Sequence, residues 1–223
     1  MNLFGIDSTS SNLSIYATYK GKIIININKQ LKFGASHLAE YIEKSLNKSR
    51  VKLSDFDAYV IGAGPGSFTG LRISFSIIKA FAIALNKPVI SLGSFYSCAY
   101  PFRSKKEKIA VISDARRNLI YFASYKSKNG NLLRQEKVQL ICLDEVLAKK
   151  DYFFVTYDSN LRDKILEVDS NIDFFPEDVY PNVRYLLAQA QNDYSKGKFS
   201  SVDKLKPLYL HPKTCQVRKV IKK

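Results

Sequence analysis

The chain of 223 residues carries 35 Lys and Arg against 20 Asp and Glu, a net charge of +15, so its partners are expected to be phosphate-rich or acidic rather than basic. With 46% hydrophobic residues it has enough apolar material for two small cores, and no low-complexity tract predicts disorder. Three widely spaced cysteines exclude a disulfide framework, and the N-terminal residues do not resemble a signal peptide, so we expect a reduced, cytoplasmic protein with no membrane partner.

The first hundred residues alternate short apolar runs with turn residues. Strands are predicted over 2–7, 13–19 and 23–28, separated by turns at 8–12 and 20–22, which is the pattern of an antiparallel meander. Helical spacing of apolar residues then predicts helices over 35–48 and 67–85, and buried runs predict strands over 57–64 and 87–94, followed by a short helix over 95–100. This order predicts an α/β fold in which helices cover a mixed sheet.

The polar stretch 101–108 is the best candidate linker, and after it the pattern begins again. Strands are predicted over 108–114, 119–125, 136–141 and 151–158, with a helix over 144–150. Residues 12–20 (NLSIYATYK) and 118–126 (NLIYFASYK) share five of nine positions, and Asp7 and Asp114 close the strands before them. Internal similarity of this kind predicts two domains related by duplication, one over 1–103 and one over 104–223.

Two hairpins that each follow an aspartate are typical of the architecture of actin and sugar kinases, in which the turns face the phosphates of a nucleotide. The first turn, DSTSSN, offers small hydroxyl groups and backbone N–H groups to an anion. Asp7 and Asp114 could hold Mg²⁺ through water, and Asp7, Ser8, Thr9 and Asp114 are the candidate nucleotide contacts. On the hairpins alone, however, Asp and Ser as ordinary turn formers explain the pattern better.

The segment GAGPGSFTGLR at 62–72 lacks the lysine of a Walker A loop and the third glycine of a dinucleotide loop. Its glycines still permit a close approach to the backbone, and Ser67 is a candidate N-cap for the helix that follows. That helix is apolar nearly all round, with Leu71, Phe75, Ile78 and Ala82 along one face. The second apolar face would lie either under the helix at 35–48 or against another protein. We favour another protein, with a phosphate nearby as the weaker alternative.

The motif GPGSFTGLR after a strand resembles the signature of the TsaB (YeaZ) family, a subunit of the bacterial machinery that makes N6-threonylcarbamoyladenosine in tRNA. Four further stretches agree in order: FGIDSTSSNLSIY, NKPVISLGSFYSCA, DARRNLIYFASY and KPLYL. The resemblance covers essentially the whole chain, although 130–200 has no distinctive match. It implies two actin-like (ASKHA, RNase H-like) domains with mixed sheets flanked by helices.

The resemblance also implies partners. The chain would be a non-catalytic dimerisation and activating subunit that pairs with the catalytic subunit TsaD or with a second copy of itself, and the ATPase TsaE would bind the resulting pair. Contact with tRNA would be indirect or through the basic surface, including the basic end from residue 204. The implied interface lies on the first-domain helices, and Phe75→Glu is expected to abolish the complex. Its residues are Gly66, Phe68, Leu71, Arg72, Phe75, Ile78, Lys79 and Ala82.

Catalysis by the chain alone is not expected. The partner's metal is held by a His-x-x-x-His pair, whereas this chain has only His37 and His211, and Gly34 stands where the family often has a histidine. No cofactor is required, and ATP or ADP with Mg²⁺ at a subunit interface is the candidate ligand. The alternative function is a small ATP-dependent phosphotransferase of the actin and sugar-kinase superfamily. The small size of the chain and the lack of a convergent catalytic base count against it.

Overall fold

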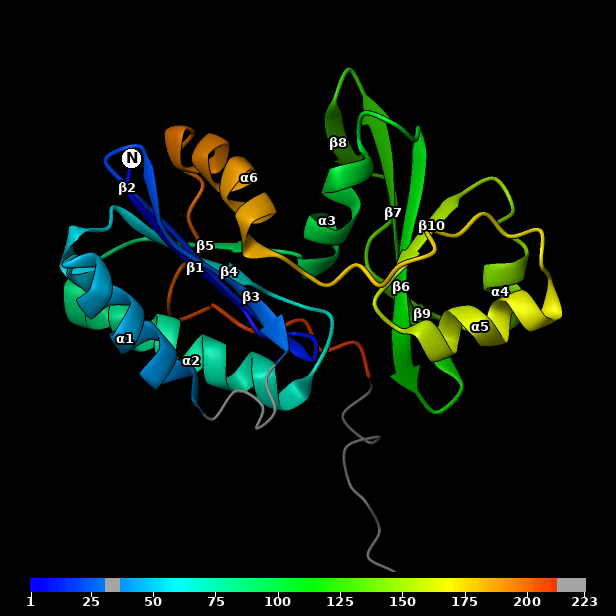
Figure 1. Ribbon diagram of the computed structural model, residues 1–223, viewed down its shortest axis with the longest axis horizontal. Helices are drawn as coiled ribbons and strands as arrows, with labels where there is room; N and C mark the ends of the chain where they lie inside the picture. The colour runs from blue at the N-terminus through cyan, green and yellow to red at the C-terminus, as the bar shows by residue number, and fades with distance from the viewer. Residues whose placement is uncertain (31–36, 212–223) are drawn as a thin grey trace, which may run out of the picture.

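The computed structural model describes residues 1–30 and 37–211, which form two lobes, each built on a five-stranded mixed sheet (Figure 1). The first sheet has the order β3-β2-β1-β4-β5. In it β1 pairs antiparallel with β2 and parallel with β4, so the meander predicted for 2–28 is confirmed. Its strands are β1 Leu3–Asp7, β2 Asn12–Tyr19, β3 Lys22–Gln30, β4 Ala58–Gly62 and β5 Val89–Leu92.

The second sheet repeats this arrangement. Its order is β10-β6-β7-β8, with β9 also paired to β7, and β6 is antiparallel to β7 and parallel to β10. The similar stretches 12–20 and 118–126 lie on β2 and β7, which are equivalent strands, in agreement with a duplication. The strands are β6 Lys108–Arg116, β7 Leu119–Lys128, β8 Asn131–Arg134, β9 Gln139–Ile141 and β10 Phe153–Thr156. The predicted α/β class, with two mixed sheets flanked by helices, is confirmed.

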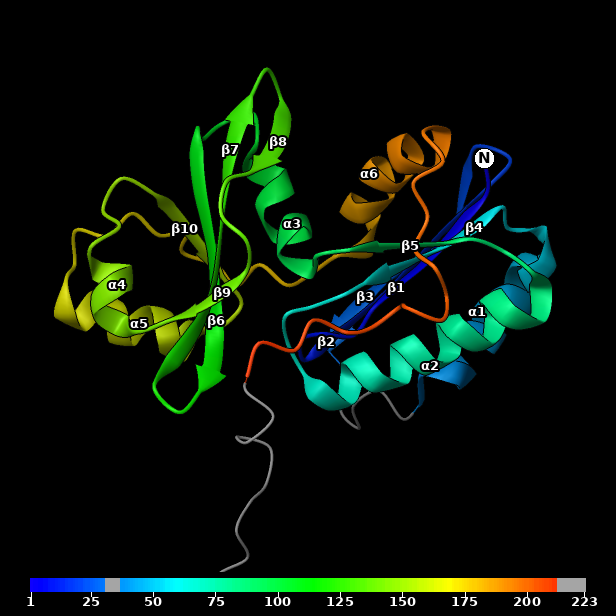
Figure 2. The same cartoon turned by 180° about the vertical axis from the view of Figure 1, so that it is seen from behind.

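Alternation along the strands divides the core of the first lobe into two layers. Phe4 and Ile6 of β1 face α1 (Leu38–Ser49) and α2 (Phe68–Leu85), whereas Leu3 faces α6 (Val183–Ser195) on the other side of the sheet. Figures 1 and 2 show α1 and α2 side by side on one face and α6 alone on the opposite face. A short 3-10 turn, η2 Leu53–Asp55, precedes β4.

The second sheet is also covered on both faces. Ile109 and Val111 of β6 pack with α3 (Ser94–Ala99) and η3 (Tyr100–Phe102), while Ala110 and Ile112 pack with α4 (Leu143–Leu147) and α5 (Ser159–Val168). The helices α5 and α6 escaped sequence reasoning because the stretch from 130 to 200 offers no distinctive motif.

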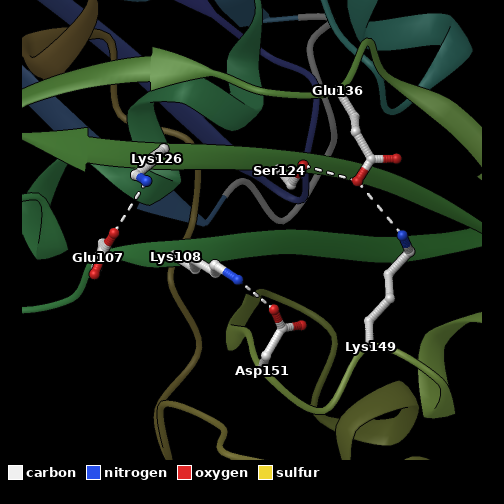
Figure 3. Close-up of polar contacts among 7 residues, drawn as sticks. All are labelled: Glu107, Lys108, Ser124, Lys126, Glu136, Lys149 and Asp151. Carbon is white, nitrogen blue, oxygen red and sulfur yellow. Dashed lines mark hydrogen bonds and ion pairs between the residues drawn. The ribbon is translucent and has the colours of Figure 1, made fainter.

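Charged side chains on the second sheet pair with one another (Figure 3). Lys149 Nζ lies 3.4 Å from Glu136 Oε1, to which the Ser124 hydroxyl donates a hydrogen bond of 3.0 Å, and Lys126 pairs with Glu107 at 3.1 Å. Solvent screens such pairs, so they add little stability. The ion pairs nevertheless occupy the carboxylates of Glu107 and Glu136, so neither carboxylate is an unpaired candidate for acid or base catalysis.

The division predicted between residues 103 and 104 does not describe the packing. The helix α3, before the division, packs on the second sheet, whereas α6, far after it, packs on the first. The chain then stays with the first lobe: Ser200 N donates to Val89 O, Leu205 is buried beside α2, and Leu208 N donates to Ala63 O. The reason is that each sheet has two apolar faces, and the helix that covers the inner face of each lobe comes from the other side of the predicted boundary.

Candidate functional site

The loop between β4 and α2 carries glycines because the turn between β1 and β2 lies directly against it. A Cβ atom at Gly66 would lie 2.1 Å from the Thr9 carbonyl oxygen, and one at Gly70 would lie 1.8 Å from the Ser8 carbonyl oxygen. Ser67 N donates to Thr9 O at 2.6 Å, and the Ser8 hydroxyl donates to Gly70 O at 2.8 Å. The segment that approaches these glycines is therefore the chain's own first hairpin, and not the other protein that the sequence led us to expect.

The same contact seals the residues predicted to bind phosphate. Asp7, Ser8 and Thr9 are 1%, 4% and 1% exposed. Asp7 Oδ1 accepts hydrogen bonds from Thr9 N at 3.0 Å and Thr9 Oγ1 at 2.6 Å, while the Ser8 hydroxyl is used by Gly70. Of the four candidate nucleotide contacts, Thr9 and Asp114 line a cavity, and Asp7 and Ser8 do not. A magnesium ion shared by Asp7 and Asp114 therefore does not fit this arrangement.

The Asp7 carboxyl is electrostatically unusual. Burial raises its pKa above the usual 3.8, and hydrogen bonding, chiefly from Thr9, lowers it only in part. Within the described residues, Asp7 Oδ2 is the one buried side-chain oxygen or nitrogen without a hydrogen-bond partner. An acceptor without a partner costs about 1–3 kcal/mol. The ionised form of Asp7 therefore weakens the fold.

Asp7→Asn is expected to make the chain more stable at neutral pH by about 1–3 kcal/mol, because the amide keeps an acceptor for Thr9 and carries no buried charge. The folded-state pKa of Asp7 lies above its unfolded value, so the wild-type free energy of unfolding falls as the pH rises from 3.8 through the raised pKa. The advantage of the variant should grow across that window and then level off. Urea unfolding from pH 4 to pH 8 measures it, and a difference that is constant with pH would contradict the prediction.

A cavity of about 660 Å³ lies where the first hairpin turn and the β6–β7 turn face each other. Asp114 is already engaged there: its Oδ1 accepts from Arg116 N at 2.7 Å and its Oδ2 pairs with Arg116 Nη1 at 3.2 Å. Burial also raises the pKa of Asp158, whose Oδ2 accepts from Asp114 N. The cavity is of a size that small ligands occupy. The prediction of a nucleotide now depends on Thr9 and Asp114 alone.

The C-terminal segment closes one side of this cavity. Tyr209 packs against Phe68 with 5.3 Å between the ring centroids, and His211 Nε2 donates to the Ala115 carbonyl oxygen at 2.8 Å. Sequence reasoning missed both residues, because no local pattern shows that the end of the chain crosses from one lobe to the other.

The described residues, 1–30 and 37–211, contain no group of three or more His, Cys, Asp or Glu side chains that could hold a metal ion. His37 lies at the start of α1, where its Nδ1 is 3.2 Å from Glu40 Oε2, and it does not line the cavity that His211 lines. Gly34, Cys215 and the basic residues from 212 onward lie outside the described residues.

The helix α2 begins where the sequence predicts, since Ser67 Oγ accepts a hydrogen bond from Gly70 N at 3.2 Å. Its inner face was assigned wrongly. Four of the eight residues expected at an interface are 0–4% exposed and pack under the first sheet, where no partner can reach them. These residues are Leu71, Phe75, Ile78 and Ala82.

The outward face of α2 is a different stripe. Ile83 is 69% exposed and Phe68 43% exposed, and the Arg72 guanidinium lies 4.0 Å from the Phe68 ring centroid. Ser76 and Ala80 lie between Phe68 and Ile83 in the helix and are also exposed, whereas Lys79 is half-buried. With a mean hydropathy of 1.6 over 18 residues, α2 is long and apolar enough to span a membrane. One third of that stretch is buried inside the first lobe.

Comparison with known protein families gives one matching model. The model described as TsaD: tRNA N6-adenosine threonylcarbamoyltransferase matches residues 34–164. The tRNA threonylcarbamoyladenosine biosynthesis protein TsaB of Bacillus subtilis is 30% identical in an alignment of 174 positions that covers 75% of this chain and 76% of that protein. The TsaB of Haemophilus influenzae is 27% identical in an alignment of 230 positions that covers 94% of this chain and 93% of that protein.

Solved structures agree on the fold. YeaZ from Pseudomonas aeruginosa superposes with a TM-score of 0.79 at 20% identity, covering 93% of this chain and all of that one. A second crystal structure, described as an uncharacterized protein with similarity to peptidase YEAZ from Pseudomonas aeruginosa, gives 0.81 at 22% identity, covering 94% and 99%. At these identities the likeness shows the fold alone.

Proposed function

This chain belongs to the TsaB (YeaZ) family and takes part in the biosynthesis of threonylcarbamoyladenosine in tRNA, and from that premise we propose that it is the non-catalytic subunit that binds and activates a TsaD-type catalytic subunit. That partner would transfer threonylcarbamoyl to N6 of adenosine 37 in tRNAs that read ANN codons. The chain would supply a docking surface and no reacting group.

The observation that carries the proposal is the outward face of α2. Ile83 and Ala80 stand in solvent along a helix whose other side is already packed, and Phe68, which packs against Tyr209, is still 43% exposed. Exposed apolar side chains among small residues and a cation on one helix face are typical of an association surface. The adjacent α1 presents polar residues, so the contact would centre on α2.

The same stripe would serve a second copy of this chain, which makes the homodimer a competitor of the heterodimer. A TsaE-type ATPase would then bind the pair formed with the catalytic subunit. Nucleotide, where it takes part, would belong to such an assembly, since within this chain the first hairpin turn is closed by Gly66 and Gly70.

Ile83→Glu tests the docking face. A glutamate there stays in solvent in the isolated chain but would be desolvated without a partner charge in the complex, so we expect the affinity for the TsaD-type subunit to fall at least about 100-fold, the equivalent of about 3 kcal/mol. Isothermal titration calorimetry with the purified partner measures the affinity, and circular dichroism checks that the chain remains folded.

Val168→Glu is the matched control, because Val168 is 59% exposed at the end of α5 in the second lobe. It makes the same change of an exposed apolar side chain to a carboxylate, far from α2, and should leave the affinity unchanged. The docking face is misplaced if both variants bind equally well. The proposed role itself fails if the wild-type chain forms no complex with that partner.

The phosphotransferase alternative is weaker. A kinase of that superfamily needs an accessible carboxylate at the first hairpin to hold magnesium, and here the Asp7 carboxyl is buried with Thr9 bonded to it. Purified chain with ATP and small carboxylic acids is expected to give no turnover, and robust turnover would favour the alternative.

A further inference from the structure

A second hollow is lined by none of the residues of the β1–β2 and β6–β7 turns. It lies between α6, α3 and the β7–β8 hairpin, elements that Figure 1 shows in its upper half. Its volume is about 870 Å³. It is lined by Tyr96 and Tyr100, which are half-buried, by Tyr125, which is buried, and by Leu133, which is 50% exposed. We call this hollow the tyrosine groove.

The rim of the tyrosine groove carries cations without counter-ions. Lys128, Arg134 and Lys196 line it and are exposed, and no aspartate or glutamate lines it. None of the three forms an ion pair within the part of the chain that the structure describes, although Lys106, Lys108, Lys126, Lys149 and Lys150 of the same lobe all do. The local field therefore favours a polyanion.

The remaining lining groups are amides and aromatic rings. Asn131 and Asn192 present hydrogen-bond donors and acceptors near the tyrosines, while the Gln189 amide already donates to Asp193 Oδ1 at 2.9 Å. Unpaired nucleotides are recognised by this combination: cations for the phosphates, aromatic surface for the bases, and amides for the base edges. An acidic peptide would pair with the cations but would not require aromatic side chains in the lining.

We propose that the tyrosine groove binds a single-stranded segment of tRNA, so that this chain contacts the substrate of its complex directly. The proposal rests on the proposed role in tRNA modification, but it concerns the face of the molecule away from the outward stripe of α2. The three cations would contact backbone phosphates, and the bases would pack against Tyr96 and Leu133, since the Tyr100 ring already stacks on Tyr185 and lies under the Arg103 guanidinium.

The test compares two triple variants of the full chain. The groove variant is Lys128→Gln, Arg134→Gln and Lys196→Gln, and the control is Lys22→Gln, Lys105→Gln and Lys164→Gln, which are exposed lysines that do not line the groove. Both remove three charges, so they have the same net charge. Binding to an unmodified tRNA transcript is measured by fluorescence anisotropy between about 50 and 200 mM salt, where phosphate contacts show as salt dependence.

The groove variant is expected to bind at least about 10-fold more weakly at 100 mM salt, with a slope of log affinity against log salt shallower by about 2, because single-strand contacts contribute about 0.7 each. The control should lose less than about 3-fold. Equal losses in the two variants, or no measurable tRNA binding by the wild-type chain, would overturn the proposal. So would a groove variant that binds tRNA normally but loses polyglutamate, since the occupant would then be an acidic protein.

The two proposals fail separately. The groove variant should keep its complex with the TsaD-type subunit, and Ile83→Glu should lose that complex while the isolated chain still binds tRNA. A groove variant that loses the partner as well would place the groove in the protein interface and contradict the inference.

Discussion

Gly70→Ala is expected to cost about 3 kcal/mol or more of folding free energy, although alanine at a helical position is normally about 1 kcal/mol better than glycine. The new Cβ would lie 1.8 Å from the Ser8 carbonyl oxygen, a backbone atom that cannot rotate away. Either α2 or the first hairpin turn must move. Movement would break the hydrogen bond from Ser8 Oγ to Gly70 O and expose the buried Asp7 carboxyl to water. Urea unfolding monitored by circular dichroism measures the loss.

Gly93→Ala is the matched control. Its Cβ would meet no atom closer than 3.8 Å, and the Gly93 backbone is extended with φ of −64°, so we expect a loss of no more than about 1 kcal/mol. Gly66→Ala should behave like Gly70→Ala, since Gly66 has φ of +151° and its Cβ would lie 2.1 Å from Thr9 O. If Gly70→Ala is as stable as Gly93→Ala, the glycines are not required by the hairpin contact.

The glycine segment at 62–72 shows what could be predicted from the sequence and what could not. It identified the loop, its helix and the Ser67 cap, because these depend on residues next to one another. It could not identify what approaches the glycines, because Ser8 is 62 residues away from Gly70. A glycine records that something is close, and only the tertiary fold shows that the neighbour is the first hairpin.

The prediction of which face of α2 binds a partner was wrong for a different reason. Apolar residues lie on every side of it, so periodicity alone cannot choose which side faces the sheet. The inner stripe was predicted as a stripe but assigned to a partner, whereas Phe68, Arg72 and Ile83 mark the side that stays in solvent. The strands and the paired hairpins were predictable because strands covered on both faces are short apolar runs bounded by turn residues. No local sequence pattern shows that α3 packs on the second sheet and α6 on the first.

Phe75→Glu is therefore expected to unfold the first lobe, and not to leave a folded chain that has lost its partner. Phe75 is 4% exposed and packs in the core between α2 and the sheet. Removing a buried phenylalanine costs about 3–5 kcal/mol, and an unpaired buried carboxylate adds to that, which together reach the whole stability of a typical domain. Thermal unfolding followed by circular dichroism should show no cooperative transition above room temperature.

Phe75→Leu, which keeps an apolar side chain of similar volume, should cost about 1 kcal/mol and keep the partner. Set against Ile83→Glu, these variants separate two consequences of one helix: a carboxylate on the inner stripe removes the fold, and a carboxylate on the outer stripe removes only the complex. The assignment of the two faces predicts that order and no other. A folded Phe75→Glu variant that fails to bind, together with an Ile83→Glu variant that binds normally, would reverse the faces and return the docking surface to the inner stripe.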